Sequence, residues 1–87
     1  MNINMETYPI DDISVASYLL VRGARLIEVT TDRPRHSVFI FENYPLCSDL
    51  KREYLNNGSV PARELLSRRS ELVSEMKNKD GGTYENR

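Results

Sequence analysis

Two side chains able to act as a nucleophile or a base occur only once in this sequence: Cys47 is the only thiol and His36 is the only imidazole. A catalytic thiolate needs its base within hydrogen-bond reach. A strand predicted over residues 37–41 lies between the two, so six or seven extended residues separate them by roughly 20 Å. We therefore interpret Cys47 as a small, partly buried packing residue in the first turn of a helix. We predict no catalytic residues.

The acidic residues give little support for a metal site. Asp11 and Asp12 are adjacent where a helix is predicted to begin, and a carboxylate there ordinarily accepts hydrogen bonds from free backbone N–H groups. Glu71 and Glu75 share one exposed helical face, where solvent usually tolerates their repulsion. One cysteine and one histidine cannot supply a four-ligand zinc set. We expect no metal and no cofactor.

Arginine is the basic residue that dominates: the chain has nine arginines and three lysines. The planar guanidinium suits phosphates and carboxylates. If the helix after Pro45 runs back along the preceding strand, the helix that begins at Pro61 starts near the hairpin tip, and its free N–H groups add positive potential there. The nucleic-acid site predicted on this assumption consists of Arg33, Arg35 and Arg63, flanked by Arg68, Lys51 and Arg52. The simpler interpretation is a solvated loop whose charges pair with nearby acids.

Arg69 is a separate case, because the apolar stripe of the last helix passes through it. Leu65 and Leu66 precede it on this stripe, and Leu72 and Val73 follow it. A buried charge needs a partner. We therefore expect Arg69 either to pair with a carboxylate, Glu28 or Glu42, or to point into an interface with another chain.

Hydrophobic periodicity predicts the elements that position these side chains. A helix over residues 13–22 begins after Asp11 or Asp12 and ends at Gly23. Residues 25–31 and 37–41 are β-rich and are joined by a polar turn. Further helices begin at Pro45 and Pro61. The prediction is an α+β domain over residues 11–79, an antiparallel β-hairpin packed by three helices in the order α-β-β-α-α. Residues 1–10 are expected to be a loosely ordered arm and residues 80–87 a disordered tail.

The second predicted strand is apolar at four consecutive positions. Because successive side chains point to opposite faces of a sheet, this run puts apolar groups on both faces. A lone hairpin is marginal in water, and two open edges favour association. The predicted interface therefore comprises Val38, Phe39, Ile40, Phe41 and Arg69. On this interpretation a homodimer is as well supported as a monomer.

Composition limits the function classes. The chain has 87 residues, is 39% hydrophobic and 29% charged, and carries a formal net charge of −1, which suits one small domain. Near-neutral charge gives no bulk attraction to nucleic acid or anionic lipid. No apolar run approaches the roughly 18 residues of a membrane span, and the first residues lack a signal-peptide pattern. We expect a cytoplasmic protein with no membrane partner.

Three segments carry a resemblance to a known family: Ser17-Tyr18-Leu19-Leu20 followed by Gly23, Val38-Phe39-Ile40-Phe41-Glu42, and Val60-Pro61-Ala62-Arg63. Over about residues 11–77 the chain resembles a family of small uncharacterised domains, classed as a domain of unknown function, that are carried by bacteria and their phages or mobile elements. The resemblance implies an architecture and a setting, and no catalytic residue.

The function predicted on these grounds is a non-enzymatic accessory or adaptor domain in a phage or mobile-element setting, contacting a nucleic-acid backbone through the arginines. The alternative is a protein-interaction or homo-oligomeric structural module with no nucleic-acid role.

Overall fold

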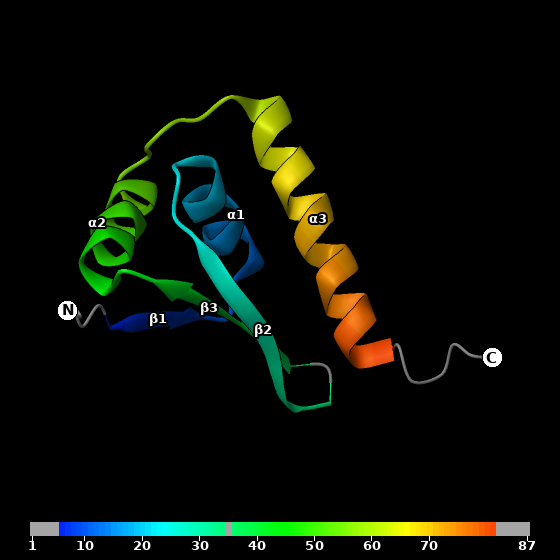
Figure 1. Cartoon of the computed structure of the whole chain (residues 1–87). Coiled ribbons are helices and arrows are strands. Elements are labelled where there is room, and N and C mark those ends of the chain that lie inside the picture. Colours follow the sequence, from blue (N-terminus) through cyan, green and yellow to red (C-terminus); the bar gives the residue numbers. More distant parts are fainter. Residues whose placement is uncertain (1–5, 35, 82–87) are drawn as a thin grey trace.

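The computed structural model describes residues 6–34 and 36–81, which form a three-stranded antiparallel sheet and three helices. All three helices lie on one side of the sheet (Figure 1). The predicted α+β class is confirmed, but the order is β-α-β-β-α-α rather than α-β-β-α-α. The elements are β1 (Thr7–Ile10), α1 (Ile13–Val21), β2 (Leu26–Arg33), β3 (His36–Glu42), α2 (Tyr44–Leu55) and α3 (Ala62–Gly81).

Strand β1 is the element that the sequence did not predict. Residues 7–10, expected within a loosely ordered arm, pair antiparallel with β3, with Thr7 opposite Glu42 and Ile10 opposite Phe39. The strand order β1-β3-β2 therefore makes β3 the central strand. At the other end, α3 continues through Gly81, two residues past the predicted limit of the domain. The remainder of the predicted arm, residues 1–5, and of the predicted tail, residues 82–87, lies outside the described residues.

Helix α1 is bounded as its sequence predicts and is buried on several sides. The Asp12 carboxylate accepts hydrogen bonds from the backbone N–H groups of Ser14 and Val15 at 2.9 and 3.3 Å. Gly23 ends the helix with a φ of 99°, a left-handed conformation that glycine adopts without a steric penalty. Because α1 contacts both α2 and α3 and covers the sheet, five consecutive residues from Val15 to Leu19 are buried.

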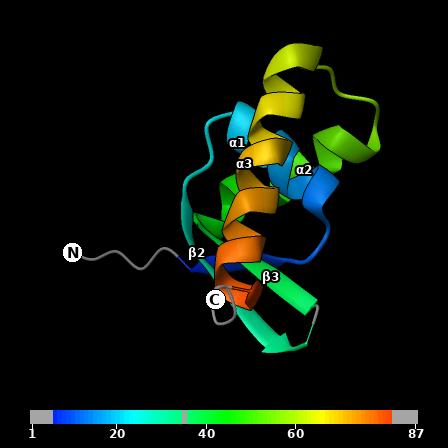
Figure 2. The ribbon, with the colours of Figure 1, turned by 90° about the vertical axis from the view of Figure 1, so that its right-hand side faces the viewer.

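Asparagine and proline set the start of α2, and proline precedes α3. Asn43 adopts a left-handed conformation with a φ of 75°, and its side chain accepts a hydrogen bond from the Leu46 backbone N–H at 3.2 Å. Pro45 follows in the first turn of α2. Pro61 lies just before α3, and its carbonyl accepts the first intrahelical bond, from Leu65. Helix α2 rises away from the sheet, so the segment 56–61 lies at the end of the molecule opposite the β2–β3 turn (Figures 1 and 2).

A single core fills the space between the helices and the sheet. Phe39 and Phe41 of the central strand are 1% and 0% exposed and form its floor. Leu19 of α1 and Leu72 of α3 cover them from the helical side, at 0% and 1% exposed. The other buried core residues are Ile10, Val15, Ala16, Ala24, Val29, Cys47 and Leu50. Within residues 6–34 and 36–81, no helix or strand covers the opposite face of this two-layer arrangement.

Candidate functional site

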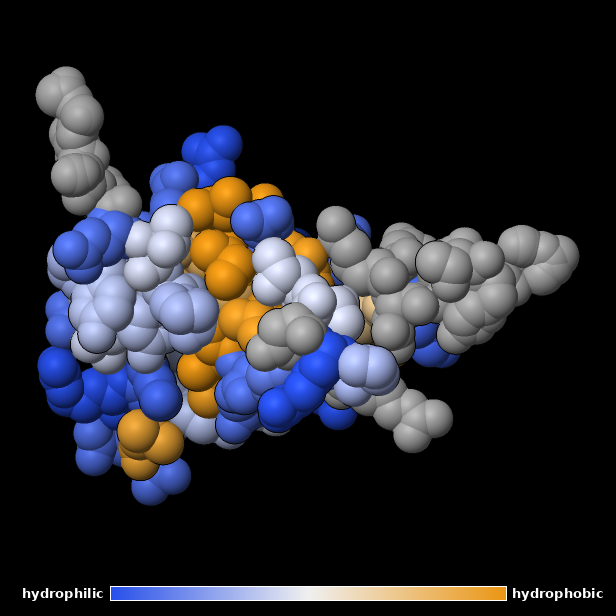
Figure 3. Space-filling view, turned by 90° about the horizontal axis from the view of Figure 1, so that it is seen from below, coloured by the Kyte–Doolittle hydropathy of each residue, from blue (hydrophilic) through white to orange (hydrophobic). Residues whose placement is uncertain are grey.

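The uncovered face of the sheet, called the outer face below, carries apolar side chains. Val38 and Ile40 alternate with the buried Phe39 and Phe41 along β3 and are half-buried. Ile27, in the bulge of β2, is 49% exposed. Figure 3, seen from below the sheet, shows a continuous apolar strip across this face. The four-residue apolar run thus does place side chains on both faces of the sheet, although Phe39 and Phe41 are buried under helices and unavailable to a partner.

Carboxylates lie at one end of the apolar centre of the outer face. The strand register puts Glu28 directly opposite Ile40 and Thr30 opposite Val38, so these four residues share one face. Glu42 follows Ile40 by two positions on β3 and belongs to the same face. Glu28 and Glu42 are both exposed. The outer face is therefore apolar at its centre and acidic at the end that Glu28 and Glu42 share, with Arg33 and His36 at its other end.

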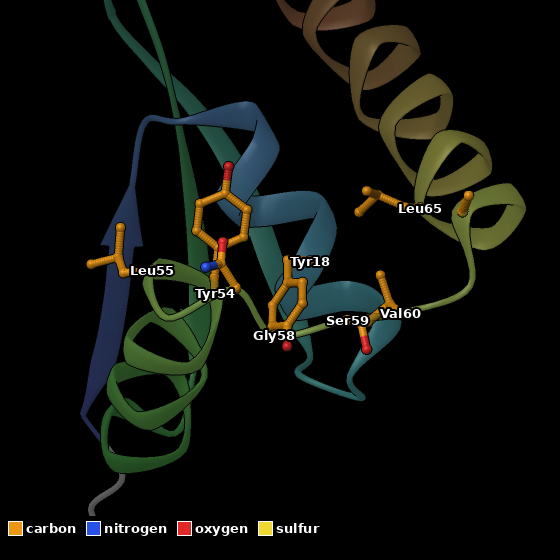
Figure 4. A pocket seen from close by; sticks show the side chains of 9 residues that line it. Tyr18, Tyr54, Leu55, Gly58, Ser59, Val60 and Leu65 are labelled. Atoms are coloured by element: carbon orange, nitrogen blue, oxygen red, sulfur yellow. The ribbon is translucent and has the colours of Figure 1, made fainter.

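A second surface feature is a groove between the end of α2 and the start of α3. Its volume is about 500 Å³. Figure 4 shows Tyr54 and Leu55 on one side, Val60 and Leu65 on the other, and Tyr18 between them. The rings of Tyr18 and Tyr54 meet edge to face, with centroids 5.5 Å apart. This groove is mostly apolar, and its one deeply buried tyrosine is already engaged by a neighbouring carboxylate.

That carboxylate belongs to Glu53, which joins α2 to α1. The Tyr18 hydroxyl donates to Glu53 Oε1 at 2.5 Å, and Arg22 donates from Nε to Oε1 at 2.7 Å and from Nη2 to Oε2 at 3.2 Å. The hydrogen bonds from Arg22 and Tyr18 lower the pKa of Glu53 from 4.5 to about 2. The bond to Glu53 in turn raises the pKa of Tyr18. With both oxygens engaged and its pKa lowered, Glu53 is a structural anion rather than a catalytic acid.

Gly58 packs directly against this network. A Cβ atom at Gly58 would clash with the Tyr18 hydroxyl and lie 2.9 Å from the Glu53 carbonyl oxygen, closer than real Cβ atoms approach. The Gly58 N–H also donates to that carbonyl at 2.8 Å. Sequence reasoning assigned Tyr18 to the helical stripe and Gly58 to a helix end, and it did not single out Glu53. A hydrogen bond between residues 35 positions apart leaves no local signal.

The structure does not bring the predicted nucleic-acid residues together. Arg33 is exposed at the end of β2, beside the β2–β3 turn. Arg63 is exposed in the first turn of α3, at the opposite end of the molecule (Figure 1). Since α3 has 20 residues, the two ends of this helix are about 30 Å apart. The predicted convergence is therefore wrong, because α2 does not run back along β3. Arg35 lies outside the described residues.

The residues expected to flank that site are also dispersed. Arg52 on α2 pairs with Asp49 at 3.0 Å, and Arg68 on α3 pairs with Glu71 at 3.0 Å. Lys51 lines a hollow of about 350 Å³ beside Pro9, Ile10, Asp11 and Val38. Helix α1 lies between α2 and α3 (Figure 1). These cations therefore belong to separate surfaces.

Arg69 is exposed, although its position falls on the apolar stripe of α3. Among the residues that the structure describes, no ion pair joins it to Glu28 or Glu42. The stripe instead contacts the core through Leu72, with Leu65 and Met76 half-buried. The predicted pairing of Arg69 across the core is therefore wrong, because this residue is exposed on the surface of α3.

The lone thiol and imidazole lie in different environments. Cys47 is 0% exposed, its Sγ lies 3.5 Å from the Glu42 carbonyl oxygen, and burial raises the pKa of its thiol. His36 lies at the start of β3, where its Nε2 is 3.1 Å from Asp11 Oδ2. A raised thiol pKa disfavours the nucleophilic thiolate. Within residues 6–34 and 36–81, no three His, Cys, Asp or Glu side chains gather closely enough to hold a metal ion.

Comparison with known proteins gives one match. The family model described as "Domain of unknown function (DUF5659)" matches residues 5–65, which includes β1 and ends in the second turn of α3. No curated protein and no solved structure matches the chain. Among the described residues, none of the helices is long and apolar enough to cross a membrane. The family match covers more than half of the chain, and the chain therefore belongs to the DUF5659 family, an uncharacterised domain family.

Proposed function

We propose that this domain is a non-enzymatic protein-interaction module whose outer face binds another protein. It acts as an accessory or adaptor domain in the bacterial cytoplasm, in a phage or mobile-element setting. The setting is carried over from the family resemblance. The observation that carries the binding role is the uncovered apolar strip across the outer face, to which Val38 and Ile40 contribute.

An uncovered apolar sheet face is unusual in a chain of this size. Antiparallel sheets with one wet face normally alternate apolar and polar residues along each strand. Here β3 keeps valine and isoleucine where polar residues would serve a solvated face. Covering the part of Val38 and of Ile40 that is still exposed contributes on the order of 1 kcal/mol each. The gain from covering this face favours a bound state.

The charges at the margin of the outer face specify the chemistry of the partner. Glu28 and Glu42 lie at one end of the apolar centre, so a complementary surface has aliphatic residues at its middle and lysine or arginine where it meets these two carboxylates. Such rim charges accelerate encounter and fix orientation. The same carboxylates repel a phosphate backbone, which argues against nucleic acid on this face.

The experiment that tests this proposal is photo-crosslinking in bacterial cells. A photoreactive amino acid replaces Ile40 on the outer face in one sample. In a matched control it replaces Ser74, which is exposed on α3, on the helical side of the sheet. The proposal predicts discrete protein adducts from position 40 and none from position 74.

Two further substitutions show whether an adduct reports binding. Glu28→Lys and Glu42→Lys, introduced together beside the photoreactive residue, reverse the charge of the rim and are expected to abolish the adduct at position 40. Equal adducts from positions 40 and 74, or no protein adduct at position 40, would contradict the proposal.

A further inference from the structure

Strand β2 leaves one of its two edges unpaired. It pairs with β3 on one side. Among the described residues, no backbone hydrogen bond joins residues 26–33 to any element other than β3. An open edge presents a row of N–H and C=O groups that can pair with another strand.

The two edges of the sheet differ in how they are protected. Strand β1 has only four residues and includes Pro9, which lacks the N–H needed for pairing. Strand β2 has eight residues and contains no proline, glycine or lysine. Bulges at its two ends enclose a regular stretch from Glu28 to Thr31. The β2 edge is therefore the one able to accept a partner strand.

We propose that a second copy of this chain pairs with the β2 edge, antiparallel and about a two-fold axis, so that two sheets become one of six strands. This inference is independent of the proposed partner of the outer face, which stays uncovered in such a dimer. The pleat requires residues of the same face to be opposite one another. The two-fold axis must therefore lie midway between one residue of β2 and the same residue of the second copy. An axis placed between two successive residues would pair residues of opposite faces.

Charge selects the register among those that the pleat permits. An axis at Glu28 sets the two Glu28 carboxylates opposite each other, which is repulsive. An axis at Thr30 pairs Glu28 with the bulge between Thr31 and Arg33. An axis at Val29 pairs Val29 with its copy and Glu28 with Thr30 of the partner subunit. This register sets Thr31 opposite Ile27 in the other bulge, but it is the one that places an uncharged residue of the regular stretch, Thr30, opposite Glu28.

Helix α3 is the part of the helical layer closest to this axis. It contacts β2, so the two α3 helices lie near the axis on the same side of the joined sheet. Val29 is 3% exposed beneath the helices. Its copy across the axis therefore extends the apolar core from one protomer into the other.

The register makes opposite predictions for two substitutions at one position. Thr30→Lys places the introduced ammonium opposite Glu28 at two symmetric points across the axis, whereas Thr30→Glu creates two repulsive pairs there. At about 0.2–1 kcal/mol for each cross-strand pair, the dimer dissociation constant falls or rises by about 2- to 30-fold, respectively. Both substitutions leave the core unchanged, because Thr30 lies on the outer face. Thr7→Lys and Thr7→Glu on β1 are matched controls and are expected to leave the constant unchanged.

Sedimentation equilibrium over a concentration series measures the dissociation constant. The expected result is a concentration-dependent rise from the 10.1 kDa monomer to twice that mass, shifted in opposite directions by the two Thr30 variants. A monomer at every concentration for both the wild type and Thr30→Lys overturns the inference. A dimer that responds equally to both Thr30 variants, or to the Thr7 variants, also overturns it. The photo-crosslinking experiment at position 40 tests only the proposed binding of a protein to the outer face. The outer-face proposal and the β2-edge dimer can therefore be contradicted independently of each other.

Discussion

The two faces of the sheet are built from alternate residues of the same strands but meet different surroundings. On the inner face, Phe39 and Phe41 are covered by helices and are almost fully buried. On the outer face, Val38 and Ile40 are half-buried, and no element of the described part of the chain covers them. Alternation alone sets which residues share a face, and the position of the helices decides which face becomes the core. An apolar residue in a strand can therefore serve either the core or a contact surface.

The largest expected effect comes from shortening one residue on each face of β3. Phe39→Ala removes a buried ring and leaves a cavity, so the free energy of unfolding falls by about 3–5 kcal/mol. Ile40→Ala shortens a half-buried side chain that no helix covers in the described part of the chain, and the expected loss is about 1 kcal/mol. Urea denaturation of both variants measures the difference. Equal losses would show that the two faces are equally buried.

The same comparison can be made on β2. Its side chains are smaller, so the expected losses in the free energy of unfolding are smaller too. Val29→Ala truncates a residue that is 3% exposed, and we expect a loss of about 2–3 kcal/mol in the free energy of unfolding. Thr30→Ala alters the outer face and stays within about 0.5 kcal/mol of the wild type. Urea titrations at protein concentrations that keep the chain monomeric test both values. A larger loss for Thr30→Ala than for Val29→Ala would reverse the assigned faces.

Gly58 tests whether the helical cover is held in place by close packing. Gly58→Ala forces a methyl group against Glu53 and Tyr18, and we expect a loss of about 1–3 kcal/mol. Thermal unfolding followed by circular dichroism reports it. Gly23→Ala is the comparison variant, because no atom lies within 4 Å of the added Cβ and its cost arises only from the φ of 99°. The Glu53 carbonyl oxygen is a backbone atom that cannot rotate away from the added methyl group, so a Gly58→Ala variant as stable as the wild type would contradict the steric explanation.

The smallest expected effect is a pH dependence of the contact between α1 and α2. The pKa of Glu53 is lower in the folded state, at about 2, than its ordinary value of 4.5. Its ionised form therefore stabilises the fold above about pH 4.5, and this contribution is lost as the pH falls from 4.5 toward 2. The melting temperatures of the wild type and Glu53→Gln should differ at pH 7 and converge over that range. A difference that is unchanged down to pH 2 would contradict the role of the ionised carboxylate.

Local sequence signals predicted the helices, because particular residues mark where these helices begin or end. Asp12 and Gly23 enclose α1, and Pro45 and Pro61 mark the starts of the later helices. Strand β1 escaped prediction because four residues that include a proline have little strand propensity of their own. Pairing with β3 makes them a strand, and that pairing joins residues more than 25 positions apart.

Relations between distant elements were the part that the sequence could not supply. The predicted arginine cluster depended on the direction of α2, which tertiary packing against α1 decides. The bond between Tyr18 and Glu53 depended on the same packing. The apolar run of β3, by contrast, indicated two apolar faces directly, because strand alternation is a local property.

The most direct test of the outer face is methyl NMR with a soluble paramagnetic agent. The signals of Val38 and Ile40 on the outer face are compared with that of Val29 on the inner face of the same sheet. We predict that the agent broadens the Val38 and Ile40 methyl signals strongly and leaves the Val29 signal nearly unchanged. Broadening of the Ile40 methyl signals no greater than that of Val29 would show that this face is covered, and would contradict its role as a protein-binding surface.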